Sequence, residues 1–133
     1  MAKADVSSLT KNQALVMEAL SGSKAPMSAY AILDQLRDAG FRAPPQVYRA
    51  LDKLVASGMV HRLESINAFV ACSHPDCSGH KTVAFAICDR CGEVAEIDDA
   101  ALASELVATA KRHAFTLAQS TIELRGTCQA CAA

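Results

Sequence analysis

The six cysteines are the residues whose type and spacing say most about the chemistry of this 133-residue chain. Four of them form two Cys-x-x-Cys pairs, Cys88 with Cys91 and Cys128 with Cys131. Two intervening residues let both sulfurs of a pair face one ion, and four thiolates make a closed tetrahedral shell for structural zinc. We therefore predict a structural zinc site at these four cysteines. A redox-active dithiol and four buried cysteines are the alternatives.

Such a site constrains the elements around it. The interval between the pairs is roughly twice the ~15–20 residues of an ordinary zinc ribbon, which leaves room for a helix and a strand. Zinc would fasten the C-terminal tail to the preceding elements and would be needed for folding. We therefore expect this site to be structural and the sensing of metal, if any, to lie elsewhere.

The composition indicates a soluble globular protein, because 51% of the residues are hydrophobic and 20% are charged. No apolar run is long enough to span a bilayer and the N-terminus has no signal-peptide pattern, so we expect a cytoplasmic chain with no membrane association. In that compartment, cysteines favour metal over disulfides. No nucleophile–base constellation or phosphate-binding loop is evident, so we expect neither an enzyme nor a small-molecule substrate.

Charge is distributed unevenly along the chain. The formal net charge is −1, but residues 1–70 carry +2 and residues 71–133 carry −3. A positive N-terminal half is compatible with a surface that faces phosphate groups.

The N-terminal half has the pattern of a small helical unit followed by a hairpin. Apolar residues at helical spacing predict helices over Leu9–Leu20, Ala29–Ala39 and Pro45–Ala56, and two short strands follow at Met59–Glu64 and Ala68–Cys72. Three helices and then a hairpin is the order of a winged helix-turn-helix, in which the third helix enters the major groove of DNA. The inward face of that helix is predicted to be Val47, Leu51, Leu54 and Val55.

The C-terminal half reads as α/β. We predict strands over Thr82–Ile87 and Glu93–Ile97, a helix capped by Asp98 that runs to about His113, and a strand over Phe115–Leu124. The helix is apolar on more than one face, which is more than so small a unit can bury alone, so we expect a homodimer.

The expected fold class is therefore α+β. A winged-helix DNA-binding domain (1–72) and a hinge loop (73–82) would precede an α/β dimerisation and metal-binding domain (83–133).

Candidate DNA contacts gather on the third helix, whose outward face is predicted to carry Gln46, Arg49 and Lys53. Arg49 is the best candidate for a base edge, because a guanidinium matches O6 and N7 of guanine. Tyr48 could contact a thymine methyl or a phosphate. The remaining candidates for backbone or groove contacts are Tyr30, Arg42 and Arg62. The tyrosines could instead pack between helices, and the basic residues could be ordinary solvated surface.

Four ordered segments resemble a known family: Pro44–Leu51, Gly58–His61, Ile87–Gly92 and Cys128–Cys131. They are similar to the ferric uptake regulator superfamily, and best to its zinc-sensing branch, the zinc uptake regulators. The resemblance covers nearly the whole chain. It implies an N-terminal winged helix, a dimerising C-terminal half and operator binding that metal switches on. Iron-sensing members carry a His-rich box where this chain has Thr82–Ala86, without a ligand, which favours zinc over iron.

The resemblance also implies a second, regulatory zinc site at His61, Cys72, His80 and Glu96. One sulfur, two imidazoles and one carboxylate suit zinc in a tetrahedron. Metal held by all four would tie the wing, the hinge and the dimerisation half together. Glu93 is the alternative carboxylate. Taken singly, each residue could be polar surface or, for Cys72, a core cysteine.

Three further potential ligands are assigned no metal. His74 and Cys77 lie in the loop beside His80 and could be substitute ligands or a third, weak site, but we favour surface residues. His113 lies near a helix C-terminus, where the helix dipole favours a histidine.

These features together predict a zinc-responsive repressor of zinc-uptake genes. It would bind near-palindromic operator DNA as a homodimer and hold two Zn²⁺ ions per subunit. The alternatives are a redox- or other-metal-responsive regulator of the same superfamily and a constitutive DNA-binding protein with only structural zinc.

Overall fold

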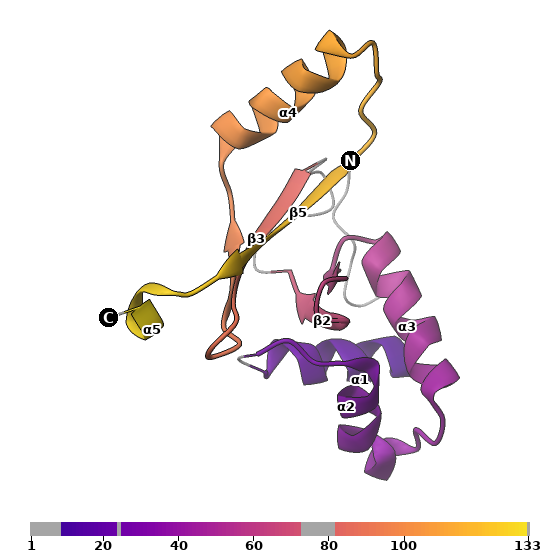
Figure 1. Ribbon diagram of the computed structural model, residues 1–133. Coiled ribbons are helices and arrows are strands. Elements are labelled where there is room, and N and C mark those ends of the chain that lie inside the picture. The colour runs from indigo at the N-terminus through magenta and orange to yellow at the C-terminus, as the bar shows by residue number, and fades with distance from the viewer. Residues whose placement is uncertain (1–8, 24, 73–81, 133) are drawn as a thin grey trace. The chain divides into compact units, whose positions relative to one another are not determined.

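The computed structural model describes residues 9–23, 25–72 and 82–132. The chain divides into two compact units, Met1–Gly79 and His80–Ala133. Within the described ranges, the first unit consists of helices and a two-stranded hairpin, and the second of a three-stranded sheet with helices (Figure 1). The predicted α+β class is thus confirmed. Among the described residues, no helix combines the length and apolar character needed to cross a bilayer.

The first helix, α1, spans Lys11–Ser21 and begins two residues later than predicted, because Thr10 caps it. The Thr10 hydroxyl accepts a hydrogen bond from the Gln13 backbone N–H at 3.2 Å, and the Gln13 side chain accepts one from the Thr10 N–H at 3.2 Å. This reciprocal capping box satisfies two of the free donors at the helix start. Leu9 therefore lies outside the helix.

The second helix is shorter than predicted. α2 spans Ala29–Gln35, with the Ser28 hydroxyl as its cap, and a single 3₁₀ turn, η2, follows at Arg37–Ala39. The α-helical pattern ends at Leu36 because the chain tightens there. The turn closes at Gly40, whose φ of 103° favours glycine, and Phe41 then donates back to the Leu36 carbonyl at 3.2 Å. This bend buries both Leu36 and Phe41.

The third helix, α3, spans Pro44–Ala56, with Pro44 in the first turn, where no helical N–H is needed. Its buried face is Val47, Ala50, Leu51 and Leu54. Val55, predicted to face inward, is 38% exposed. One residue beyond Leu54 is a rotation of about 100° around the helix axis, which carries Val55 off the buried stripe. Ala50 takes the inward position instead.

The hairpin consists of β1 (Val60–Leu63) and β2 (Ala68–Ala71), paired antiparallel. Met27 adds a short bridge to it, with hydrogen bonds to and from Phe69 of 3.0 and 2.8 Å. α1, α2, α3 and the hairpin close over one apolar core that includes Ile32, Leu51 and Leu54. The three-helix-plus-hairpin order predicted for a winged helix is therefore present.

The C-terminal unit is built on β3 (Thr82–Cys88), which lies between β4 (Val94–Ile97) and β5 (Ser120–Gly126). β4 is antiparallel to β3 and β5 is parallel to it. The last strand begins at Ser120, later than predicted. Ala114 adopts a φ of 54° and Phe115 donates back to Ala110, so the chain first closes the preceding helix.

α4 spans Ala100–Arg112, and its N-cap is Asp99 rather than the predicted Asp98, since the Asp99 carboxylate accepts from the Leu102 N–H at 3.1 Å. None of its residues is buried within the single chain. Figure 1 shows the helix extending beyond the end of the sheet. A short terminal helix, α5 (Gln129–Ala132), which the sequence pattern did not predict, begins directly after Cys128.

Candidate metal centres and nucleic-acid face

The two Cys-x-x-Cys pairs come together in the C-terminal unit. Cys88 is the last residue of β3, and Cys91 lies in the turn toward β4. Cys128 directly precedes α5, and Cys131 lies within it. All four sulfur atoms lie within 4.8 Å of one another. The Cys91 and Cys128 sulfurs are 3.8 Å apart, which matches the roughly 3.8 Å edge of a tetrahedron with Zn–S bonds of about 2.3 Å. The donor set and its spacing fit a structural zinc ion.

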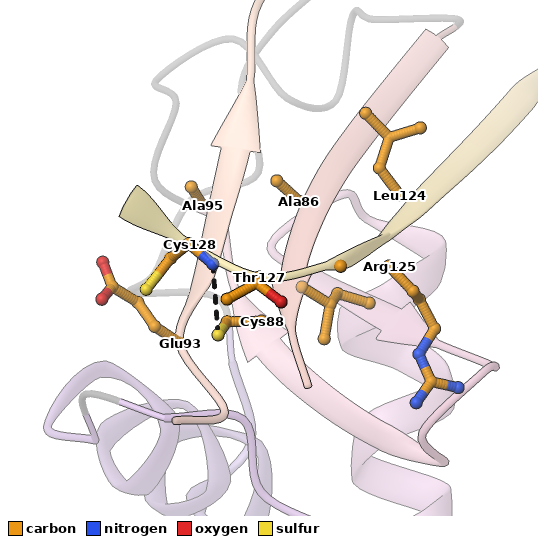
Figure 2. A pocket seen from close by; sticks show the side chains of 10 residues that line it. Ala86, Cys88, Glu93, Ala95, Leu124, Arg125, Thr127 and Cys128 are labelled. Carbon is orange, nitrogen blue, oxygen red and sulfur yellow. Dashed lines mark hydrogen bonds between the residues drawn. The ribbon is translucent and has the colours of Figure 1, made fainter. Parts of the chain in front are cut away.

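Strand pairing explains why residues so distant in sequence meet. β3 and β5 run parallel and in register up to Cys88 and Gly126, so Cys128 emerges beside the end of β3. The Cys88 sulfur there accepts hydrogen bonds from the backbone N–H groups of Cys128 at 3.3 Å and Cys91 at 3.5 Å. Figure 2 shows the first of these bonds. Such bonds favour a thiolate, the form that binds metal.

The thiols of the cluster differ in pKa. The N–H groups of Cys128 and Cys91 lower the pKa of Cys88 from 9.0 to about 6, against the opposing effect of burial. Hydrogen bonding with Cys128 and Cys88 raises the pKa of Cys131 to about 12. The Glu93 N–H acts to lower the pKa of Cys91, but the neighbouring Cys88 thiol and burial raise it overall. A lowered pKa for Cys88 beside raised pKa values for Cys91 and Cys131 is expected of close sulfurs without metal, because one thiolate disfavours a second beside it.

An apolar hollow of about 210 Å³ lies beside the cluster (Figure 2). Its floor includes Ala86, Ala95 and Leu124, which are cross-strand neighbours in one row of the sheet. The hollow therefore places a mainly apolar surface next to Cys88 and Cys128, and the hydrophobic shell around a metal site influences solvent access and the properties of the bound metal.

The predicted regulatory ligands divide between the two units. In the N-terminal unit, His61 on β1 pairs with Val70 of β2, and Cys72 follows two residues after Val70. Cross-strand partners and residues two apart share a face of a hairpin, so the His61 and Cys72 side chains lie on the same face. A ring nitrogen of His61 and the sulfur of Cys72 lie within 4.8 Å of each other. His61 is only 9% exposed.

The other predicted ligands belong to the second unit or lie outside the described residues. Glu96 is half-buried on β4 of the C-terminal unit, opposite Phe85 of β3. Glu93, the alternative carboxylate, is exposed, and its backbone carbonyl accepts from the Cys88 N–H at 2.9 Å. His80 lies outside the described residues, as do His74 and Cys77. Cys72 is disulfide-bonded in this structure, so metal ligation by this residue requires the reduced thiol.

His113 caps the C-terminal end of α4, where its N–H donates to the Ala110 carbonyl at 3.1 Å. It is exposed. This position agrees with a helix-end role, and it belongs to neither of the groups of potential metal ligands found among the described residues.

A groove on the N-terminal unit brings together the start of α1 and the outer face of α3. It is lined by Thr10, Asn12, Gln13, Gln46, Arg49, Ala50, Asp52 and Lys53. Three predicted DNA contacts, Gln46, Arg49 and Lys53, therefore share one surface. The α1 residues were not among the predicted contacts. The Thr-x-x-Gln capping pattern, which marks a helix start, was the available signal for them.

Gln46 has a second role in this groove. Its amide oxygen accepts hydrogen bonds from the backbone N–H groups of Arg42 at 2.7 Å and Ala43 at 3.1 Å. The side chain thereby caps the start of α3, and its NH₂ group is left as the part that can face a ligand.

The remaining predicted DNA contacts are placed differently. Tyr48 is partly buried against the core, as the packing alternative predicted, whereas Tyr30 is 62% exposed on α2. Arg42 is exposed just before α3. The Arg62 guanidinium lies over the Phe69 ring, 5.8 Å from its centre, which holds the side chain on the wing.

The fold and these sites define the class of protein. Residues 8–125 match the model of the ferric uptake regulator family, so the chain belongs to that family. Its members regulate transcription and are not enzymes.

Within the family, the chain is similar to zinc uptake regulators. It is 40% identical to the zinc uptake regulation protein of Escherichia coli K12, over 92% of this chain and 72% of the relative. A crystal structure of holo XcZur matches with 47% identity and a TM-score of 0.84, over 93% of this chain and 86% of that chain. A zinc uptake regulator complexed with zinc and DNA matches with 40% identity and a TM-score of 0.86, over 92% of this chain and 82% of that chain.

Proposed function

We propose that this protein is a cytoplasmic, zinc-responsive repressor of zinc-uptake genes that acts as a homodimer. The observation that carries the proposal is the 40% identity, over 92% of the chain, to a zinc uptake regulator whose structure holds both zinc and DNA. The proposed domains are a winged-helix domain (1–72), a hinge (73–82) and a dimerisation domain (83–133). The exposed apolar residues of α4 and its lack of buried positions support its burial against a second subunit.

Each subunit is proposed to hold two zinc ions with different roles. The first, at Cys88, Cys91, Cys128 and Cys131, is structural and closed to water, because four protein sulfurs complete a tetrahedron. The second is regulatory and uses His61, Cys72, His80 and Glu96. The closeness of His61 to Cys72 on one face of the wing supports this second site, since two of its four ligands are then held in place before metal arrives.

The proposed mechanism is a shift in population. Without regulatory zinc, the two winged helices adopt orientations that do not match both half-sites of an operator. Zinc bound by residues from both domains selects the orientation in which both α3 helices reach successive major grooves of a near-palindromic site. Moving the population from mostly open to mostly closed requires a differential binding free energy of about 5.5 kcal/mol. By reciprocity, operator DNA should tighten zinc binding.

DNA contact is proposed for the groove residues Gln46, Arg49 and Lys53, with Tyr30, Tyr48, Arg42 and Arg62 as flanking contacts. Arg49 is the proposed reader of guanine, since it is exposed on the outer face of α3. Gln46 can approach the DNA only as a donor, because its amide oxygen is occupied at the helix cap.

The test is operator binding, followed by fluorescence anisotropy while free zinc is set with a buffered chelator under reducing conditions. Zinc per subunit is measured in parallel. We expect two zinc ions per subunit, with operator affinity following the more weakly held one. Operator binding that is indifferent to the chelator, with one tightly held zinc, would instead identify a constitutive binder. Operator binding controlled by oxidant rather than by zinc would identify a redox regulator.

Arg49→Ala and Lys53→Ala should weaken DNA binding in different ways. Loss of Arg49 is expected to cost about 1–3 kcal/mol of operator binding and to relax the preference at one base pair. Loss of Lys53 should weaken binding to all sequences alike and reduce the slope of log affinity against log salt by about 1. Binding to operator and to scrambled DNA at several salt concentrations separates the two. A uniform loss for Arg49→Ala would exclude it as a base reader.

A further inference from the structure

The two residues inside the first Cys-x-x-Cys contact the second pair or the residues that lead into it. The Asp89 N–H donates to the Gly126 carbonyl at 2.8 Å, which continues the β3–β5 pairing past its last register position. One oxygen of the Asp89 carboxylate accepts from Nε and Nη2 of Arg125 at 2.9 and 2.7 Å. Asp89 thus fastens Arg125 and Gly126, which lead into the second pair, to the first pair.

Arg90 holds the opposite side. Its Nη1 donates to the backbone carbonyl of Cys131 at 3.2 Å. The chain after Gly126 has left the strand pairing, so the Arg90 contact connects the two pairs beyond the end of the ladder. The Asp89–Arg125 contact reinforces the last paired positions of the same ladder. Figure 2 shows Arg125 lining the same hollow as Cys88 and Cys128.

We propose that Asp89, Arg90 and Arg125 form a clasp that holds the two cysteine pairs together and slows the loss of metal from the four-cysteine site. They are positioning residues that act through the cysteines. The inference rests on the proposed zinc at that site, and it assigns control of zinc retention to residues that are not ligands.

The clasp acts on metal exchange because zinc leaves a four-thiolate site one ligand at a time. When one sulfur detaches, it either rebinds or moves away with its segment of chain. Contacts that keep the second pair near the first favour rebinding. The Asp89–Arg125 pair is about half exposed, and such pairs contribute little to global stability. The predicted effect therefore falls on zinc retention and leaves the folding of the loaded protein nearly unchanged.

The opposite charges of Asp89 and Arg125 allow the clasp to be distinguished from a purely electrostatic effect on zinc binding. A zinc ion with four thiolates carries a net charge of −2, so a nearby carboxylate repels the site and a nearby guanidinium stabilises it. If only charge mattered, Asp89→Asn would tighten zinc binding and Arg125→Met would weaken it. If the clasp controls zinc retention, both variants weaken zinc binding, because each removes one partner of the same contact.

The experiment measures zinc transfer from the loaded, full-length protein to a colorimetric chelator. The slow phase is assigned to the four-cysteine site from cobalt-loaded protein, in which sulfur-to-cobalt charge-transfer absorbance reports the thiolate ligands directly. Changes to residues that position metal ligands typically alter metal affinity by about 10–100-fold, so we expect the slow phase to be roughly 10-fold faster in both Asp89→Asn and Arg125→Met. The exchanged pair, Asp89→Arg with Arg125→Asp, should regain retention, and Arg125→Lys should fall between.

Arg112→Met is the matched control. It breaks an exposed ion pair with Glu105 in the same unit and should leave zinc transfer unchanged. Slower transfer from Asp89→Asn, or unchanged transfer from both single variants, would overturn the clasp. If either single variant fails to fold, the exchanged pair and Arg125→Lys decide in its place. Wild-type protein without zinc at the four cysteines would refute the proposed site itself, and zinc analysis identifies that outcome before any variant is compared.

Discussion

Cys128→Ser is expected to remove the structural zinc and to unfold much of the C-terminal unit. The serine hydroxyl is a poor zinc ligand, and the backbone N–H of residue 128 would no longer be oriented toward Cys88 by a shared metal. α5 and the end of β5 depend on this junction, and in small metal-bound units the free energy of metal binding is folding free energy. We expect one zinc ion fewer per subunit, loss of the homodimer and loss of operator binding even in excess zinc.

Zinc analysis, sedimentation and operator-binding anisotropy measure these three losses, and circular dichroism measures the unfolding. Cys72→Ser is the matched control, because it makes the same chemical change at a cysteine outside the cluster, and it should keep the structural zinc and the dimer. A folded, dimeric Cys128→Ser protein that retains its full zinc content would show that the four-cysteine cluster holds no structural ion.

Cys72→Ser should separate zinc binding from DNA binding. It removes the proposed sulfur ligand of the regulatory site, whose neighbour His61 lies within 4.8 Å on the same face of the hairpin. Zinc bound by the remaining ligands then contributes little free energy toward the closed arrangement of the two domains. Complete loss of the switch would leave about 1% rather than about 99% of the molecules in the closed state, which lowers operator affinity in saturating zinc by about 100-fold.

Anisotropy with buffered zinc and a reducing agent measures this effect, because Cys72 binds metal only as a free thiol. His61→Ala should behave like Cys72→Ser. Arg49→Ala should lower operator affinity, but its residual operator binding should still depend on zinc. An unchanged zinc response in a folded, dimeric Cys72→Ser protein would refute the proposed switch. Comparison of Glu96→Gln with Glu93→Gln would identify the carboxylate ligand.

Local patterns predicted the secondary structure well, and the differences have local causes. The spacing of apolar residues placed all three helices of the winged unit, because that spacing records which face is buried. It missed the break at Leu36, since the tightening of the chain there depends on burying Phe41. It also placed Val55 inward, although the buried face of α3 includes Ala50 and not Val55. The late start of β5 follows from a left-handed Ala114, which periodicity does not report.

The amino-acid sequence by itself determined which residues can bind metal, the order of the elements and the family. Ligand type and Cys-x-x-Cys spacing are properties of short segments, and so are capping residues and apolar periodicity. The tertiary structure decided which distant residues meet. Parallel pairing of β3 with β5 brought Cys128 to Cys88, and the hairpin register put His61 and Cys72 on one face. The cap bonds of Gln46, the pairing of Asp89 with Arg125 and the bond from Arg90 to Cys131 were likewise decided by the tertiary structure. Such contacts depend on how strands and turns are aligned across the fold, and local residue patterns do not encode that alignment.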